Sequence, residues 1–222
     1  KTAKRMPTPE LLIDLLKQDD KPIEWLVEPY IPANGIIFLY GKTSIGKSPL
    51  SWKLAQSVSE GLDFFHCPAK QGPVLYIEID THLTLVKPRL RLLDPVPQQL
   101  WWLDLYPRFD ILNVNPDQHR ILLNANEKIR PALVIINTLR KTHSHKDGDS
   151  NIASHVYSAF QGRFPESALL FTHHDKKTFK DPQIETSDDE AFSGSQAWLN
   201  DAQFVLHLVI KNKDERKVDL IH

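Results

Sequence analysis

Residues 41–48 form a glycine-rich segment with the spacing G-x-x-x-x-G-K-S, which is typical of loops that bind the phosphates of nucleotides. An apolar run at residues 35–40 precedes the segment, and residues 49–58 after it carry apolar side chains at helical spacing. In such a loop, successive backbone N–H groups surround a phosphate, and the next helix directs its positive end at the same anion. The sequence therefore predicts a site for a nucleoside triphosphate between a buried strand and a helix.

Two side chains at the end of this segment carry the expected chemistry. Lys47 can reach the β- and γ-phosphates, and the Ser48 hydroxyl can bind Mg²⁺. Pro49 is compatible with the start of a helix, because the first helical turn has no backbone N–H partner to lose. We expect the nucleotide to contact the whole loop and the first helical residues: Gly41, Lys42, Thr43, Ser44, Ile45, Gly46, Lys47, Ser48 and Pro49.

The rest of the sequence alternates between short, uniformly apolar runs and segments with helical spacing. Apolar strands that are separated by helices predict an α/β fold, in which a mostly parallel, twisted sheet has helices on both faces. The end of the chain, residues 204–221, has two apolar runs around a charged turn and predicts a β-hairpin. We expect strands at 35–40, 73–79, 100–103, 132–136 and 168–172, and helices at 47–60, 83–93, 117–129 and 151–163.

Residues 1–34 precede the first of these strands and have a different pattern. Residues 9–17 have the spacing of a short amphipathic helix, and residues 25–27 are apolar. We therefore divide the chain into a lead-in segment, 1–34, and one α/β domain, 35–222, whose length suits a full hydrophobic core. The chain begins with Lys1 instead of Met, so we expect it to be part of a longer protein.

The composition is that of an ordinary globular protein, with 41% hydrophobic residues, 25% charged residues and a formal net charge of −1. This charge argues against binding of nucleic acid over the whole surface, but it is compatible with a channel lined by a few basic loops. Cys67 is the only cysteine, which excludes an internal disulfide and fits a reducing compartment. No apolar run has the length of a membrane span, so we expect a cytoplasmic protein without a membrane partner.

Polar residues follow several of the predicted strands at the points where these strands end. In a doubly wound sheet, ligands bind at the carboxyl ends of the strands, so the residues at these ends are candidates for catalysis. The phosphate loop follows the first strand, and polar residues follow three others: Glu78 and Asp80, Asn137, and His173 and His174. Their convergence on the phosphate loop would form a site that hydrolyses a nucleotide.

The phosphate loop and three further motifs occur in an order and at spacings that resemble a known family. These motifs are LYIEID at residues 75–80, VIINTLR at 134–140 and LFTHH at 170–174. Together they are similar to the RecA-type ATPase core, and most closely to the RepA-like hexameric replicative helicases of plasmids and phages. The resemblance covers nearly the whole chain. It implies ATP and Mg²⁺ as cofactors, a hexameric ring of identical subunits, hydrolysis at the subunit interfaces, and translocation along single-stranded DNA during replication in a bacterial cytoplasm.

The same resemblance implies roles for individual residues. Asp80 takes the position of the carboxylate, usually Glu in this family, that polarises the attacking water. Glu78 is the alternative general base, because strand alternation places it on the same face as Asp80; a salt bridge at the strand end is its other interpretation. His174, together with His173, takes the position of a γ-phosphate sensor, although two solvated loop histidines would look the same. Arg89 takes the position of an arginine that stacks on the adenine, and a solvated helix face is the alternative.

Asn137 departs from the family pattern, which has Asp at this position to hold Mg²⁺ through a water molecule. Asn keeps the shape and one acceptor oxygen but loses the negative charge that offsets the dication. Three interpretations follow: a natural weak ATPase, an engineered inactivating substitution, or a nucleotide-dependent switch that does not hydrolyse. We expect Ser48 and Asn137 to be the metal-binding residues.

Two polar loops, 140–151 and 175–192, follow strands that end at the predicted site. A ring of subunits would bring both loops to a central channel, where Arg140, Lys141 and the aromatic Phe179 suit a single strand of DNA. The second loop has a net negative charge, so two ordinary surface loops are the alternative. A ring also needs a basic residue that enters the neighbouring nucleotide site, and the charged hairpin turn offers three: Lys211, Lys213 and Arg216.

Two other functions stay open at this stage. A recombinase-like or DNA-repair ATPase with the same fold would form filaments instead of closed rings. A nucleotide-dependent binding protein with weak hydrolysis would also fit Asn137, because ATP would then change assembly or partner affinity without being consumed.

Overall fold

The structure is a computed structural model that describes residues 9–19, 22–145, 151–174, 197–212 and 217–221. Its centre is a seven-stranded sheet with the strand order β5-β4-β6-β7-β3-β8-β9. The pair β8–β9 is antiparallel, and the other neighbouring pairs are parallel. The strands are β3 (Gly35–Gly41), β4 (Val74–Glu78), β5 (Leu100–Asp104), β6 (Leu133–Asn137), β7 (Ala168–His174), β8 (Phe204–Asn212) and β9 (Lys217–Ile221).

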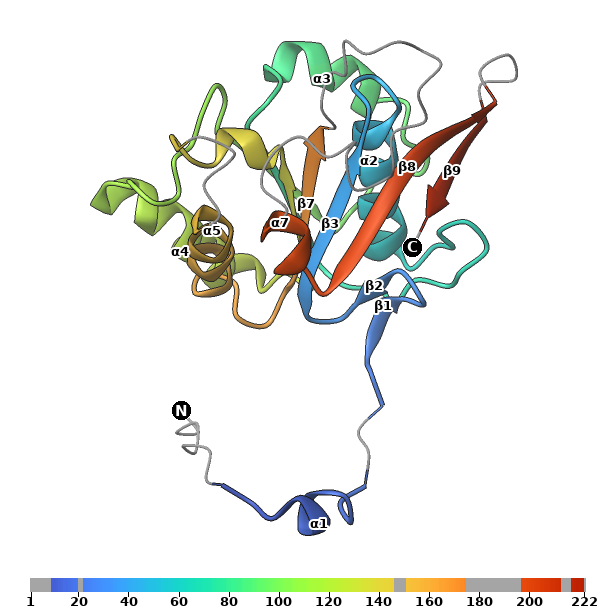
Figure 1. Cartoon of the computed structure of the whole chain (residues 1–222). Helices are drawn as coiled ribbons and strands as arrows, with labels where there is room; N and C mark the ends of the chain where they lie inside the picture. The colour runs from blue at the N-terminus through green and yellow to red at the C-terminus, as the bar shows by residue number, and fades with distance from the viewer. Residues whose placement is uncertain (1–8, 20–21, 146–150, 175–196, 213–216, 222) are drawn as a thin grey trace, which may run out of the picture.

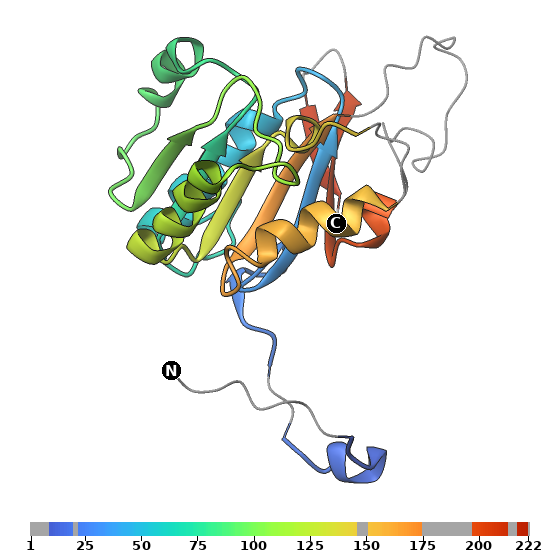
Figure 2. The same cartoon turned by 90° about the vertical axis from the view of Figure 1, so that its left-hand side faces the viewer.

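Helices cover both faces of this sheet (Figures 1 and 2). One face carries α2 (Lys47–Glu60) and α3 (Leu83–Leu90), and the other carries α4 (Pro116–Ile129), α5 (Ile152–Gln161) and α7 (Ala197–Asn200). Successive residues of β3 point to opposite faces, as a strand requires. Phe38 accordingly belongs to the apolar cluster under α5, whereas Ile37 and Leu39 belong to the cluster under α2. The predicted α/β fold is confirmed.

Part of the lead-in segment packs on the same core. Strands β1 (Trp25–Val27) and β2 (Ile31–Pro32) form a small antiparallel sheet, and Leu26, Val27 and Ile31 are buried in the apolar cluster under α2. Helix α1 (Leu12–Leu15) lies on an arm that extends away from the sheet and has no buried residue (Figure 1). The helix expected over 9–17 is therefore a single short turn. The division of the chain at residue 34 stays a prediction.

The predicted strands and helices are present, with differences at their ends. Helix α3 ends at Leu90, soon after Pro88, which lacks the N–H group that a helix interior requires. Strand β7 continues to His174, so His173 and His174 lie in the sheet and not in the loop after it. A 3₁₀ turn, η1 (Leu139–Lys141), and helix α7 were not predicted from the sequence.

Among the residues that the structure describes, no helix is long and apolar enough to cross a membrane.

Candidate nucleotide-binding site

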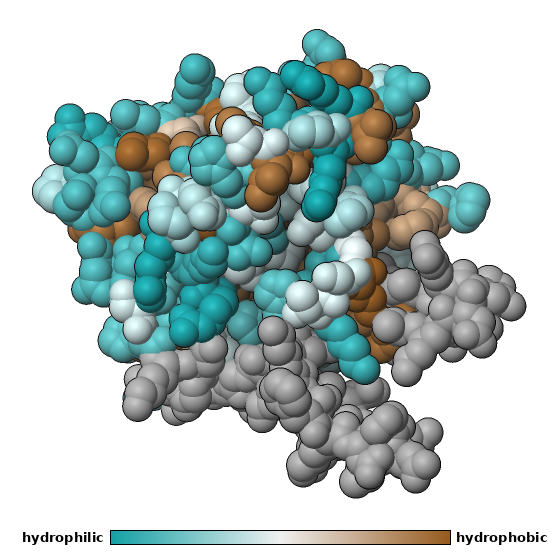
Figure 3. All heavy atoms as spheres, turned by 90° about the horizontal axis from the view of Figure 1, so that it is seen from above, coloured by the Kyte–Doolittle hydropathy of each residue, from teal (hydrophilic) through white to brown (hydrophobic). Residues whose placement is uncertain are grey.

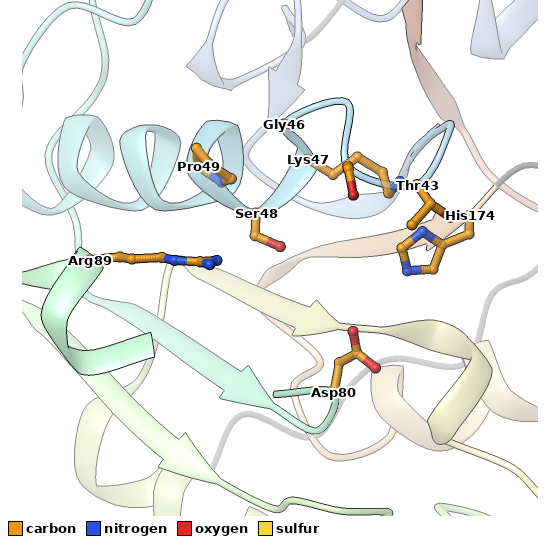
Figure 4. A pocket seen from close by; sticks show the side chains of 9 residues that line it. Thr43, Gly46, Lys47, Ser48, Pro49, Asp80, Arg89 and His174 are labelled. Atoms are coloured by element: carbon orange, nitrogen blue, oxygen red, sulfur yellow. The ribbon is translucent and has the colours of Figure 1, made fainter. Parts of the chain in front are cut away.

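A cavity of about 400 Å³ lies at the carboxyl ends of the strands, beside the start of α2. Seen from above, the described surface on this side of the molecule is mostly hydrophilic, with scattered hydrophobic residues (Figure 3). The cavity is lined by residues from the phosphate loop, α2, the turn after β4, α3 and β7, most of which Figure 4 labels: Thr43, Ser44, Gly46, Lys47, Ser48, Pro49, Asp80, Arg89 and His174.

The phosphate loop joins β3 to α2 and owes its shape to two glycines. Gly41 has φ +156°, and a Cβ atom there would lie 2.8 Å from the backbone oxygen of Leu208 in the adjacent strand β8. Gly46 has φ +115°, a conformation that other residues rarely adopt, and α2 begins at the next residue. These positions require glycine for close strand packing and for the turn, so the spacing seen in the sequence has a direct structural cause.

Lys47 lies across the loop that precedes it. Its Nζ atom donates to the backbone oxygens of Gly41 at 2.6 Å and Lys42 at 2.9 Å, and the residue is 6% exposed. These contacts hold the ammonium group within the curve of the loop. A phosphate group that enters the loop would meet this positive charge and the N-terminus of the 14-residue helix α2.

His174 reaches the cavity because β7 pairs with β3. The parallel register places Tyr40 opposite His173 and Gly41 opposite His174, so the last residue of β7 lies beside the first residue of the loop. His173 is 3% exposed, and its ring packs 5.8 Å from that of Phe38. Of the two histidines, the second lines the cavity, and its role as a sensor stays a prediction.

Asp80 and Arg89 line the cavity opposite the phosphate loop. Asp80 follows β4, and its side chain points toward Ser48 and His174 across the cavity (Figure 4). Its Oδ1 atom lies 3.1 Å from Nζ of Lys141, which also donates to the Asp80 backbone oxygen at 3.2 Å. The Arg89 side chain extends from α3 toward Ser48 and forms part of the cavity lining.

Glu78 and Asn137 lie behind the wall of the cavity and do not line it. Glu78 is completely buried, and both of its carboxylate oxygens accept hydrogen bonds from Nδ2 of Asn137, at 3.0 and 2.9 Å. Thr172 in turn donates from Oγ1 to Oδ1 of Asn137 at 2.7 Å. Burial raises the pKa of Glu78 above its ordinary value, and the hydrogen bonds from Asn137 and from two backbone N–H groups act in the opposite direction.

Comparison with known proteins agrees with this geometry. Residues 2–179 match a family described as an AAA domain. The chain belongs to this AAA-domain family. A solved structure of an ATPase domain is similar to this chain, with a TM-score of 0.58 at 12% identity over 85% of this chain and 76% of that chain. The flagellar accessory protein FlaH from Methanocaldococcus jannaschii gives a TM-score of 0.49 at 13% identity over 84% of this chain and 74% of that chain.

A search of curated proteins finds no significant match to the sequence. The likeness to the solved ATPase domain shows the fold, and together with the AAA-domain family match it confirms the predicted resemblance to the RecA-type P-loop core. The closer relationship to RepA-like helicases stays a prediction.

The residues around the cavity of this AAA-domain protein fit a nucleotide triphosphate and Mg²⁺. Lys47 and the start of α2 supply the positive environment for phosphates. The Ser48 hydroxyl supplies a hard oxygen donor, and at such sites one or two protein ligands suffice because phosphate oxygens and water complete the shell of Mg²⁺. Asn137, which was also predicted to bind the metal, directs its amide at Glu78 and Thr172. The described residues hold no group of three or more His, Cys, Asp or Glu arranged as a metal site.

Sequence reasoning did not identify the partners of the predicted residues. Lys141 pairs with Asp80 in the structure, and its predicted contact with DNA stays a prediction. Thr172 received no role, although its hydroxyl orients Asn137. Both residues lie close in the sequence to predicted site residues, and only this proximity could have indicated that they belong near the site. The whole loop 175–192, including Phe179, and residues 146–150 of the first loop lie outside the described residues, as do Lys213 and Arg216 of the hairpin turn.

Proposed function

We propose that this chain hydrolyses ATP and uses the hydrolysis to move along single-stranded DNA, as RepA-like helicases do in replication. The observation that carries the proposal is the convergence of Lys47, Ser48, Asp80 and His174 on one cavity. These four side chains come from the phosphate loop and from the ends of two other strands. Each has the chemistry that its place in a phosphoryl-transfer site requires.

Each side chain has a separate task in this proposal. The Lys47 ammonium, which donates to the loop oxygens in the structure, would bind the β- and γ-phosphates, and the Ser48 hydroxyl would hold Mg²⁺. Bound Mg²⁺ would supply charge neutralisation at the phosphates. Asp80 accepts a proton from the attacking water, and a neutral His174 donates a hydrogen bond to a γ-phosphate oxygen. Arg89 extends beside the cavity, where it can stack on the base.

The DNA-binding part of the proposal rests on the position of the loops. The segment 140–151 leaves β6, and 175–192 leaves β7, so both begin next to the strand ends that carry Asn137 and His174. A hexameric ring would place them in a central channel and complete each ATP site with a basic residue from the neighbouring subunit. We infer that the ATPase domain spans 35–222, that 1–34 is its lead-in segment, and that the protein acts in the cytoplasm of a bacterium that carries the encoding plasmid or phage.

The proposal is tested by steady-state ATP turnover with and without single-stranded DNA. We expect turnover that depends on Mg²⁺, that rises on addition of DNA, and that disappears in Lys47→Ala. The exposed Lys53→Ala on the same helix is the matched control and should behave like the parent. If ATP is hydrolysed but single-stranded DNA neither binds nor changes the rate, the translocase part of the proposal is wrong.

One observation favours a second function, a nucleotide-dependent binding protein with little hydrolysis. The Asp80 Oδ1 atom lies 3.1 Å from Nζ of Lys141, so this oxygen already has a partner and must leave it before it can accept a proton from a water molecule. In that case ATP would bind with ordinary affinity and would change assembly or DNA affinity without turnover. Nucleotide binding measured by calorimetry, combined with undetectable phosphate release, would favour this function over the first.

A further inference from the structure

We propose that Glu78 and Asn137 form a matched buried pair that positions Asp80, so that Asn137 is the complement of Glu78 and not a weakened metal ligand. The structural half of the proposal, the matching of the two side chains, stands on their contacts alone. The catalytic half, the positioning of a general base, rests on the proposed ATPase function.

The contacts of Glu78 show what its carboxylate does. Its Oε1 atom accepts hydrogen bonds from the backbone N–H groups of Asp80 and Thr81, both at 2.9 Å, in addition to the bond from Asn137. Its Oε2 atom accepts from the same Asn137 amide at 2.9 Å. A buried carboxylate with these partners caps the turn that follows β4. It thereby fixes the backbone from which the Asp80 side chain enters the cavity.

The contacts of Asn137 explain why an amide occupies this position. Its Nδ2 group donates to Glu78, while its Oδ1 atom accepts from Thr172. Its backbone oxygen also accepts from the N–H groups of Ile79, at 2.7 Å, and Asp80, at 3.2 Å. An amide both donates and accepts, whereas an ionised Asp of the same shape only accepts. Asp at this position would keep the bond from Thr172 and would lose the bonds to Glu78.

The charges at this position also favour an amide over a carboxylate at residue 137. Glu78 and Asn137 are directly opposite each other in the register of β4 and β6, and they are 0% and 5% exposed. A carboxylate in place of the Asn137 amide would lie about 3 Å from Glu78, where two like charges cannot both stay ionised without a large cost. In this chain the negative charge lies on β4 and the neutral amide on β6. The resemblance to the RepA-like family implies a carboxylate on β6, so we infer that the charge has moved to the adjacent strand.

The test is a double-mutant cycle with the parent chain, Asn137→Asp, Glu78→Gln and the combined Glu78→Gln/Asn137→Asp variant. In the combined variant, the oxygen of the glutamine amide accepts from the two backbone N–H groups, and its nitrogen donates to the new carboxylate. The swap therefore restores the lost bonds with the charge on the other strand. Thermal unfolding and ATP turnover are measured for each protein at pH 5 and pH 8.

We expect Asn137→Asp to lower the melting temperature by about 5–10 °C. The loss should be larger at pH 8 than at pH 5, because at low pH one of the two carboxyl groups is protonated and can donate to the other. The combined variant should recover most of the loss. ATP turnover should change in the same way as the melting temperature. We expect kcat in Asn137→Asp to be about tenfold lower than in the parent, with an unchanged KM for ATP, and to recover in the combined variant.

The opposite pattern would overturn the proposal. If Asn137 were a weakened metal ligand, Asn137→Asp alone would raise Mg²⁺-dependent turnover without loss of stability, and the combined variant would show no recovery. If Asn137→Asp does not fold, the folding or failure of the combined variant decides between the two outcomes. Thermal unfolding can be measured in a protein that does not hydrolyse ATP. An inactive parent would therefore contradict the proposed function, but the melting temperatures of the four proteins would still show whether Glu78 and Asn137 form a matched pair.

Discussion

The two walls of the nucleotide cavity are built in different ways. The phosphate wall, residues 41–49, is one continuous stretch of chain between β3 and α2. The opposite wall combines Asp80, which lines the cavity, with Glu78 and Asn137 behind it, and these come from two adjacent strands. The phosphate wall has the G-x-x-x-x-G-K-S spacing, whereas the opposite wall has Asn137 where the resemblance to RepA-like proteins implies Asp. The contacts of the phosphate wall therefore depend on spacing within one stretch of chain, whereas those of the opposite wall depend on the register of two strands.

The largest expected effect lies in the phosphate wall. Lys47→Ala removes the ammonium group that the proposal assigns to the phosphates, and we expect ATP turnover to fall by about 10²-fold or more. Rapid measurement of phosphate release would check this, with the exposed Lys53→Ala on the same helix as control. Turnover within a few fold of the parent would mean that the loop does not bind the reacting phosphates.

The next effect concerns the opposite wall and comes from removal of the lysine that pairs with Asp80. Lys141 pairs with Asp80 at the start of the loop 140–151, so we expect Lys141→Met to raise turnover without DNA by a few fold and to reduce stimulation by DNA. The exposed Lys128→Met on α4 is the control. A fall in turnover would instead show that Lys141 holds Asp80 in its active position.

A smaller effect, on stability, is expected from the residue that orients Asn137. Thr172→Val replaces the hydroxyl that donates to Asn137 Oδ1 by a methyl group and leaves that buried oxygen without this partner. We expect a loss of about 1–3 kcal/mol in the free energy of unfolding, measured by urea denaturation. The exposed Thr84→Val on α3 should cost less, and equal losses in the two variants would remove the argument for a specific network.

The smallest effect is a pH dependence. Because the pKa of Glu78 is raised in the folded protein, the neutral form is favoured by folding. Its contribution to stability is complete below the unfolded pKa, about 4.3, and is lost as the pH rises through the higher folded pKa. Glu78→Gln should therefore lose less stability than the parent between pH 4 and pH 7. Glu127→Gln, an exposed position on α4, should follow the parent.

The sequence allowed most of the fold to be predicted for a physical reason. A uniformly apolar run such as residues 132–136 indicates a strand that is buried on both faces. The spacing of the phosphate loop depends on Gly41 and Gly46, whose backbone conformations other residues rarely adopt. Residues placed by strand ends, such as Asp80 and His174, were identified as candidates because parallel strands share one edge.

The coupling between strands could not be predicted in the same way. Glu78 and Asn137 are far apart in the sequence, and their pairing depends on the register of β4 and β6, which no local pattern determines. The interaction of Lys141 with Asp80 depends on the turn η1, which has no strong signal of its own. A departure from a family motif, as at Asn137, was visible in the sequence, but its cause lay in a neighbour on another strand.

The most direct test of this account compares ATP binding and turnover in Asp80→Asn and in the parent, with Asp104→Asn, at the end of the adjacent strand β5, as control. If Asp80 is the general base of the cavity, the Asn variant should bind ATP with unchanged affinity while its turnover falls by about 10²-fold or more, with and without DNA. Turnover in Asp80→Asn equal to that of the parent would contradict the account, because the base would then lie elsewhere.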